Sequence, residues 1–170
     1  MTGHNTIKMT ELSVLYKKLG FRENKTYIQS GNVIFRTEDN ADPLHVANVV
    51  EEGILKKFGY TIPVMIRTTE ELRKLRSANP YLSEPGFDPS RMAVIFLHGE
   101  VTEKQIEKMK NINYPPDKYQ ISDREIFTYC PDGFGKTKLY TNFFEKKMGV
   151  TGTARNWKTV VTLLEMAEEF

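Results

Sequence analysis

The chain has 170 residues and a mass of 19.7 kDa, which is room for one domain or two small halves and excludes a large multidomain enzyme. Hydrophobic residues make up 39% and charged residues 27% of the chain, as in globular rather than disordered or fibrous proteins. With 24 Lys and Arg against 22 Asp and Glu, the formal charge is only +2. Any surface for nucleic acid or a membrane would therefore have to come from local clustering of charge.

The sequence gives no sign of export, membrane insertion or metal binding. No basic start precedes an apolar stretch, and no window approaches the roughly 18 apolar residues of a membrane span. The single cysteine, Cys130, cannot form an internal disulfide, which fits a reducing compartment. The three histidines lie far apart without metal-ligand spacing. We expect a cytoplasmic protein with no membrane partner, no metal and no cofactor.

In the first half, apolar residues at helical spacing alternate with short β-rich runs. Gly20 and Gly59 follow two of the helical patterns, where glycine favours a helix end. Ser30-Gly31-Asn32 has the composition of a hairpin turn. The predicted elements are a helix over 9–19, strands over 25–29 and 33–36, a helix over 44–58, a strand over 62–67 and a short helix from 68 to about 79.

The second half begins after a segment rich in proline, 81–90, which is typical of a linker. Its first run, 92–97, is unbroken apolar sequence suited to a buried central strand, and Thr102 to Gln105 is a capping box. The predicted elements are a strand over 92–97, a helix over 102–109, strands over 118–121 and 125–129, a helix over 137–148, a turn at 149–153 and a helix over 156–168.

This order predicts an α+β fold of two related halves. The first half reads α-β-β-α-β and the second β-α-β-β-α, so each is one strand short of the ferredoxin-like, split β-α-β arrangement. We expect mostly antiparallel sheets, a C-terminal helix, and a division into 1–80, a linker at 81–90, and 91–170, the whole countable as one domain. The opening strand of the first half is absent, supplied by the second half, or lost through a truncated start.

Four stretches of the sequence resemble a known bacterial family. They are Gly3-His4-Asn5, Ile7-Lys8-Met9, Tyr27-Ile28-Gln29-Ser30-Gly31-Asn32-Val33-Ile34-Phe35, and Thr153-Ala154-Arg155-Asn156-Trp157-Lys158-Thr159-Val160. Together they resemble domain-of-unknown-function family 1697. The resemblance implies a single soluble α+β protein with two ferredoxin-like halves and no established activity.

The chain departs from that family at its start. Family members usually have a strand and a glycine-rich turn before the position of His4, whereas only Met1-Thr2-Gly3 precede it here. We therefore expect the first sheet to have an unprotected edge, which favours pairing with another chain, including a homodimer. His4 and Asn5 are then either remnants of a site or an N-terminal cap.

Gly133-Phe134-Gly135-Lys136-Thr137 looks like the end of a phosphate-binding loop, but it fails the spacing test. A P-loop needs a glycine five residues before the Gly of Gly-Lys-Thr, and Cys130 stands there. A weaker interpretation is a glycine-rich turn leading into a helix at Thr137, where Lys136 and Lys138 would lie beside free N–H groups and hold an anion. The alternative is an ordinary turn with solvated lysines.

Charge is uneven around this motif. Between positions 136 and 158 six basic residues oppose one acid, Glu145, so this window carries 6 − 1 = +5. Within it, Arg155 can hold a phosphate or carboxylate, and Asn156 is either a ligand or the N-cap of the last helix. The neighbouring Trp157 has the spacing of a core residue.

Elsewhere the candidates are weaker. The resemblance draws attention to Gln29 and Asn32, which otherwise read as a bare hairpin turn. Cys130 has no nearby His or Asn in sequence that would make it a nucleophile. Adjacent acids such as Glu51 and Glu52 fit solvated helix surfaces.

Three functions follow from these residues, and the sequence does not decide whether any of them is catalytic. The leading hypothesis is binding of a phosphate-bearing ligand or nucleic acid through the basic window. The second is a small-molecule enzyme or ligand-binding domain, whose pocket between the halves would be lined by His4, Gln29, Asn32 and Arg155. The third is a structural partner protein that pairs through the open edge of the first sheet.

Overall fold

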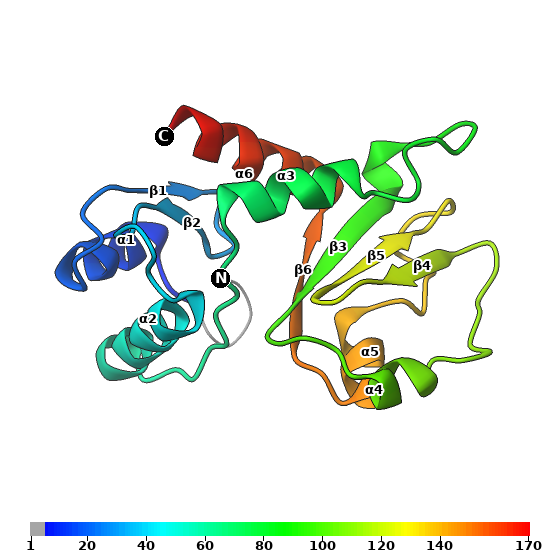
Figure 1. Cartoon of the computed structure of the whole chain (residues 1–170), viewed down its shortest axis with the longest axis horizontal. Coiled ribbons are helices and arrows are strands. Elements are labelled where there is room, and N and C mark those ends of the chain that lie inside the picture. The colour runs from blue at the N-terminus through cyan, green and yellow to red at the C-terminus, as the bar shows by residue number, and fades with distance from the viewer. Residues whose placement is uncertain (1–5) are drawn as a thin grey trace. The chain divides into compact units, whose positions relative to one another are not determined.

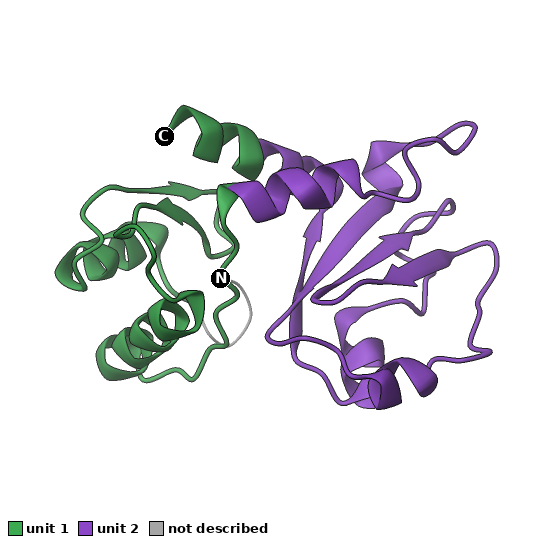
Figure 2. Ribbon diagram, in the orientation of Figure 1, with its two compact units in different colours: residues 1–69, 163–170 green, residues 70–162 purple. Residues whose placement is uncertain are grey.

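The structure, a computed structural model, describes residues 6–170 and has an α+β fold, as predicted (Figure 1). It has two antiparallel sheets and ends in a long helix. The chain divides into two compact units, one made of residues 1–69 and 163–170 and the other of residues 70–162 (Figure 2). Within residues 6–170, no helix is both long and apolar enough to cross a membrane.

The first unit packs a β-hairpin with two helices. Its elements are α1 (Met9–Lys18), β1 (Asn24–Tyr27), β2 (Asn32–Phe35) and α2 (Pro43–Phe58). The hairpin is confirmed, but its turn lies at 28–31 rather than 30–32, with Ile28 at φ 48° and Gly31 at φ 80°. Leu12 and Leu15 of α1 join Val50 and Ile54 of α2 in the core.

Helix α2 begins and ends where the sequence predicts because both ends are capped. The carboxylate of Asp42 accepts a hydrogen bond from the backbone N–H of Leu44 at 3.1 Å, and Pro43 occupies the first turn. Gly59 takes the left-handed conformation at φ 78°, which a side chain would disfavour.

The strand predicted over 62–67 is wrong, because residues 59–68 form neither a helix nor a strand. A strand needs a neighbour whose carbonyl groups accept its N–H bonds. Here the N–H of Val64 instead donates to the side-chain carboxylate of Glu51, at 3.1 Å. Glu51 is therefore half-buried against this segment rather than solvated on the helix surface.

The second unit contains a four-stranded sheet. After α3 (Thr69–Ser77), which crosses the boundary between the units, it runs through η1 (Pro89–Arg91), β3 (Met92–Leu97), α4 (Glu103–Glu107), β4 (Lys118–Ile121), β5 (Glu125–Tyr129), α5 (Thr141–Met148) and β6 (Gly152–Asn156). The sheet order is β4-β5-β3-β6 and every pair is antiparallel. Two interleaved β-α-β connections through α4 and α5 give this order.

Three strands and one capping box of the second unit form as predicted. The ranges 92–97, 118–121 and 125–129 are β3, β4 and β5. Thr102 and Gln105 exchange side-chain and backbone hydrogen bonds at 2.9 and 3.2 Å, which starts α4.

The second half is not one strand short. Residues 152–156, which were expected to be partly turn and partly helix, form β6, and α6 (Trp157–Glu169) follows it directly. Gly152 permits this pairing, because a Cβ there would lie 2.8 Å from Ile95 Cγ2 and 3.1 Å from the Phe96 carbonyl oxygen. The stretch 152–156 is short and polar, so its sequence gives no sign that the backbones of β3 and β6 approach each other closely.

The proline-rich segment 81–90 lies inside the second unit. Tyr81 and Phe87 each stack on Tyr129 with ring centroids 5.6 Å apart, and the Tyr129 hydroxyl accepts a hydrogen bond from the N–H of Asp88. Aromatic packing therefore fastens this segment to β5. The division into separately folding halves at 81–90 stays a prediction.

Candidate anion-binding site

The turn that carries Lys136 and Lys138 is held by a buried threonine. Thr137 Oγ1 accepts hydrogen bonds from the Leu139 N–H at 3.0 Å and from the Cys130 thiol at 3.4 Å. Thr137 and Leu139 are buried, so the two lysines on either side of Thr137 project into solvent.

The helix predicted to begin at Thr137 begins at Thr141 instead, with Tyr140 at its N-cap. The Thr137 hydroxyl accepts a hydrogen bond from the Leu139 N–H in a local turn. Such side-chain bonds compete with the backbone bonds of a helix. Lys136 and Lys138 therefore lie five and three residues before the first residue of α5 and are not part of its first turn.

A second segment faces this turn and makes a pocket with it. The pocket has a volume of about 220 Å³ and is lined by residues of the loop before β4 and of the turn after β5. Lys138 Nζ lies 5.1 Å from the centroid of the Tyr114 ring, within cation–π range. The lining residues are Tyr114, Pro115, Pro116, Asp117, Asp132, Gly133, Lys136 and Lys138; we call this the Lys136–Lys138 pocket.

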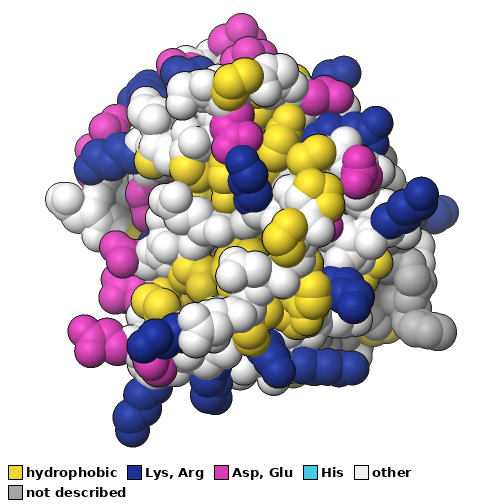
Figure 3. All heavy atoms as spheres, turned by 90° about the vertical axis from the view of Figure 1, so that its right-hand side faces the viewer, with side chains coloured by type: hydrophobic (Ala, Val, Ile, Leu, Met, Phe, Trp, Pro, Cys, Tyr) yellow, Lys and Arg dark blue, Asp and Glu magenta, His cyan; other side chains and the backbone are white. Residues whose placement is uncertain are grey.

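The pocket mixes charges of both signs with an apolar wall. Lys136 and Lys138 supply two ammonium groups, Asp117 and Asp132 two carboxylates, and Tyr114 with its two prolines the apolar surface. Viewed from the right-hand side of Figure 1, the molecule shows apolar side chains interspersed with lysine and arginine (Figure 3).

Cys130 lies behind this turn, and its thiol donates to Thr137 Oγ1. Its side chain is fully buried, and burial raises the pKa of the thiol, with the Asp117 carboxylate acting in the same direction. The hydrogen bond to Thr137 opposes this rise but is the smaller cause. A thiol with a raised pKa holds little of the reactive thiolate at neutral pH.

Arg155 and Asn156 lie elsewhere, on the edge strand β6. Arg155 pairs with Val94, and its guanidinium donates to Thr153 Oγ1 and to the Ala154 carbonyl, both at 2.8 Å. Burial lowers the pKa of this guanidinium. Asn156 Oδ1 accepts from the Thr159 N–H at 2.8 Å, so Asn156 caps α6, and Trp157 is a buried core residue as predicted.

The basic window therefore does not form one patch. The loop at Tyr114 leads into β4, whereas Arg155 lies on β6 at the other edge of the same sheet. Three strand spacings separate the two edges, which is about 14 Å. Of the remaining cations of the window, Lys146 and Lys147 lie on α5 and Lys158 lies on α6.

Gln29 and Asn32 belong to the first unit and stabilise its hairpin. Gln29 Nε2 donates to the carbonyl of Ile7 at 2.6 Å. Asn32 is buried, and its Nδ2 donates to Ser30 Oγ at 2.8 Å and to the Tyr27 carbonyl at 3.3 Å. His4 lies outside the described residues, and the predicted pocket between the halves stays a prediction.

The sequence did not single out Tyr114, Asp117 or Asp132. The adjacent Pro115 and Pro116 indicate a turn, but nothing in the spacing of 114–117 and 132–138 indicates that the two segments meet. Only the pairing of β4 with β5 brings them together, because one segment precedes β4 and the other follows β5.

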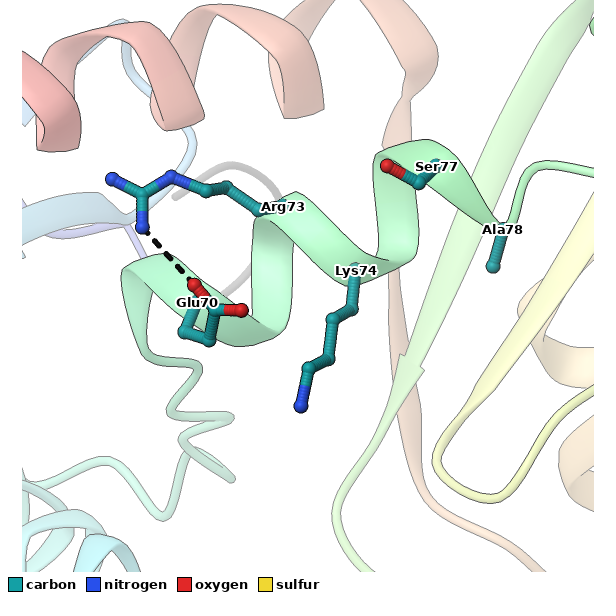
Figure 4. Close-up of a pocket in the computed structure, with 5 residues that line it drawn as sticks. All are labelled: Glu70, Arg73, Lys74, Ser77 and Ala78. Carbon is teal, nitrogen blue, oxygen red and sulfur yellow. Dashed lines mark hydrogen bonds and ion pairs between the residues drawn. The ribbon is translucent and has the colours of Figure 1, made fainter.

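A further hollow, of about 360 Å³, runs along α3 and is lined by Glu70, Arg73, Lys74, Ser77 and Ala78 (Figure 4). Four of its lining residues belong to α3 and Ala78 directly follows that helix, and Arg73 pairs with Glu70 at 3.1 Å. Across residues 6–170, no three His, Cys, Asp or Glu side chains are grouped so as to hold a metal ion.

The fold and this pocket define an α+β protein of two units with a mixed-charge surface site. The chain belongs to a family described as proteins of unknown function, DUF1697, whose profile matches residues 1–127. A solved structure of a conserved bacterial protein from Streptococcus pneumoniae is similar, with a TM-score of 0.74 and 19% identity, covering 98% of this chain and 92% of that one. At this identity the likeness shows the fold alone. No curated protein matches the sequence.

Proposed function

We propose that the chain binds a small phosphate ester in the Lys136–Lys138 pocket. The observation that carries the proposal is that two exposed lysines and the Tyr114 ring line one pocket, with Lys138 Nζ 5.1 Å from the ring centroid. Lysine ammonium groups bind phosphate as point charges and form charge-assisted hydrogen bonds with it.

The pocket also favours a ligand that carries hydroxyl groups. The carboxylates of Asp117 and Asp132 accept hydrogen bonds, so they favour hydroxyl donors beside the phosphate that the lysines hold. The Tyr114 ring offers an apolar face to the carbon skeleton of such a ligand. A phosphorylated sugar or polyol combines these features.

Size favours a small ligand over nucleic acid. The volume of about 220 Å³ lies below the roughly 300–1,000 Å³ of sites for drug-sized molecules. A nucleic-acid surface needs cations along a continuous track, and the cations of the basic window are spread over a turn, α5, β6 and α6.

Titration calorimetry and amide chemical shifts with inorganic phosphate, ribose 5-phosphate, ribose and a 12-nucleotide single strand test this proposal. We expect ribose 5-phosphate to bind more tightly than phosphate or ribose alone, with shifts at residues 114–117 and 132–138. The double variant Lys136→Ala with Lys138→Ala should bind at least about tenfold more weakly.

The matched control is Lys146→Ala with Lys147→Ala, which removes the same charge from exposed positions on α5. It should change affinity by less than about twofold. Equal loss in both double variants, or no binding of ribose 5-phosphate in low salt, would contradict the proposal. Tighter binding of the oligonucleotide with a steep salt dependence would favour a nucleic-acid interface instead.

A further inference from the structure

The side chain of Arg91 lies against the wall of the Lys136–Lys138 pocket. Gly133 is one of the residues that line this pocket. A Cβ on Gly133 would lie 2.5 Å from Arg91 Nη1 and 3.7 Å from Arg91 Cζ. The guanidinium therefore takes the place that a side chain of residue 133 would fill, and it brings a third cationic group to the two lysines.

Backbone hydrogen bonds fix the position of Arg91 relative to the pocket. The Cys130 N–H donates to the Arg91 carbonyl at 2.8 Å, which continues the pairing of β3 with β5 by one residue. The Gly133 N–H donates to the Cys130 carbonyl at 2.8 Å and closes a turn, with Gly133 at φ 92°. Gly133 and Lys136 are three residues apart, so at most about 11 Å separates their Cα atoms. The guanidinium and the lysines thus belong to one small surface of the second unit.

The guanidinium is held in this position by a weak ion pair. Its Nε lies 3.7 Å from Asp88 Oδ2, which is too far for a hydrogen bond, and the side chains are 43% and 50% exposed. The other oxygen of this carboxylate, Oδ1, accepts from the N–H and the hydroxyl of Ser90, at 3.0 and 2.8 Å. Exposed ion pairs of this kind stabilise a protein little. An incoming anion can therefore take the guanidinium from Asp88.

We propose that Arg91 binds the phosphate group of the ligand together with Lys136 and Lys138, exchanging Asp88 for this phosphate when the ligand enters. The inference rests on the proposed function, because it adds a third group to the same pocket. A guanidinium donates two parallel hydrogen bonds to phosphate oxygens, whereas an ammonium acts as a point charge. The fork of Arg91 therefore orients the phosphate as well as attracting it.

Three cationic groups around one phosphate favour a monoester. A phosphate monoester has three terminal oxygens and a charge of about −1.5 to −2 at neutral pH, which suits the fork of Arg91 and both lysines. A diester has one terminal oxygen fewer and a single negative charge. Arg91 therefore makes the pocket select the terminal phosphate of a sugar or polyol over the internal phosphate of a nucleic-acid strand.

Calorimetry with ribose 5-phosphate and with its matched diester, ribose 5-(methyl phosphate), tests this inference on the whole chain. Arg91→Ala should lower affinity for the monoester at least about tenfold and affinity for the diester by much less, because a charge-assisted hydrogen bond to the third oxygen is lost. Arg91→Lys keeps the charge without the fork and should recover only part of the affinity. Thermal unfolding checks that each variant is folded.

A second pair of variants tests the exchange of partners. Asp88→Asn keeps an oxygen for the bonds from Ser90 and removes the charge that holds Arg91, so it should strengthen monoester binding about two- to fivefold. In the Arg91→Ala background the same substitution should give no gain. The matched control is Asp123→Asn, which removes one exposed carboxylate at the opposite end of β5 and should change affinity little at 0.15 M salt.

Loss of affinity in Lys136→Ala with Lys138→Ala, but none in Arg91→Ala, would overturn this inference and leave the proposed function standing. So would equal loss of monoester and diester binding in Arg91→Ala, full recovery in Arg91→Lys, or an equal gain from Asp88→Asn with and without Arg91. No binding of ribose 5-phosphate by the wild-type chain would overturn both proposals.

Discussion

Replacing Thr137 by valine keeps the shape of the side chain and removes the hydroxyl that holds the lysine-bearing turn. That hydroxyl accepts from the Leu139 N–H at 3.0 Å and from the Cys130 thiol at 3.4 Å, and all three residues are buried. In Thr137→Val the Leu139 N–H is left buried without this acceptor, which costs about 1–3 kcal/mol. Loss of the weaker hydrogen bond from the Cys130 thiol adds little to this free-energy cost.

We therefore expect Thr137→Val to lower the free energy of unfolding by about 1–3 kcal/mol. A loss of 1 kcal/mol shifts Tm by about 2–4 °C in a chain of this length, so the shift is measurable by calorimetry. Hydrogen exchange at Leu139 should quicken at least about tenfold. Affinity for ribose 5-phosphate should fall too, because Lys136 and Lys138 lose their fixed geometry.

Thr137→Ser is the matched control. It loses the methyl group but keeps the acceptor, so exchange at Leu139 should stay near that of the wild type even if Tm falls slightly. The reasoning is refuted if Thr137→Val leaves exchange at Leu139 unchanged, or if Thr137→Ser speeds it equally.

Three further predictions concern the rest of the second unit. Asn156→Ala should lower the free energy of unfolding by about 1 kcal/mol in urea denaturation, whereas Asn156→Asp keeps an acceptor for the Thr159 N–H and should cost little; equal loss in both would refute the cap. Gly152→Ala should cost about 1–3 kcal/mol because its Cβ meets Ile95 and the Phe96 carbonyl, while Gly99→Ala, with open space around it, should be near neutral in the same assay. Cys130 should react with a thiol reagent at pH 8 far more slowly in the folded chain than in urea, and comparable rates would contradict its burial. Because burial raises the pKa of this thiol, its contribution to stability is complete below the ordinary thiol pKa and is lost as the pH rises through the raised value.

Local signals, such as caps and turn residues, predicted the helices and strands whose ends those signals determine. The helix over 44–58 was readable from its apolar spacing and from Gly59 at its end, and the helix after Thr102 from its local capping box. Strands β3, β4 and β5 were readable from apolar or β-favoured runs between turn residues. These features depend on neighbours a few positions away, which a sequence displays directly.

The errors in the fold arose where a partner distant in sequence decides the structure. Residues 62–67 have strand composition, yet within residues 6–170 they join no strand ladder, and the Val64 N–H donates to the Glu51 carboxylate. Residues 152–156 have weak strand composition, yet they form strand β6 because they pair with β3. Whether a segment forms a strand is settled by its neighbour as much as by its own side chains.

The candidate site divides in the same way. Lys136 and Lys138 were found from the glycine-rich turn, and Asn156 was recognised as a cap, since these are local patterns. The partners of the lysines were not predictable, because Tyr114 and Asp117 lie about twenty residues earlier and meet them only across the ends of β4 and β5.

Charge and composition were settled by the sequence alone: a nearly neutral chain of globular composition, with a basic window near its C-terminus and an α+β order of elements. Tertiary structure decided how that charge is used. The window that counts as +5 along the chain is divided between a turn, two helices and an edge strand, because strand pairing places residues by hydrogen-bond register and not by their distance in sequence. What remains together is one pocket with two lysines, two aspartates and a tyrosine.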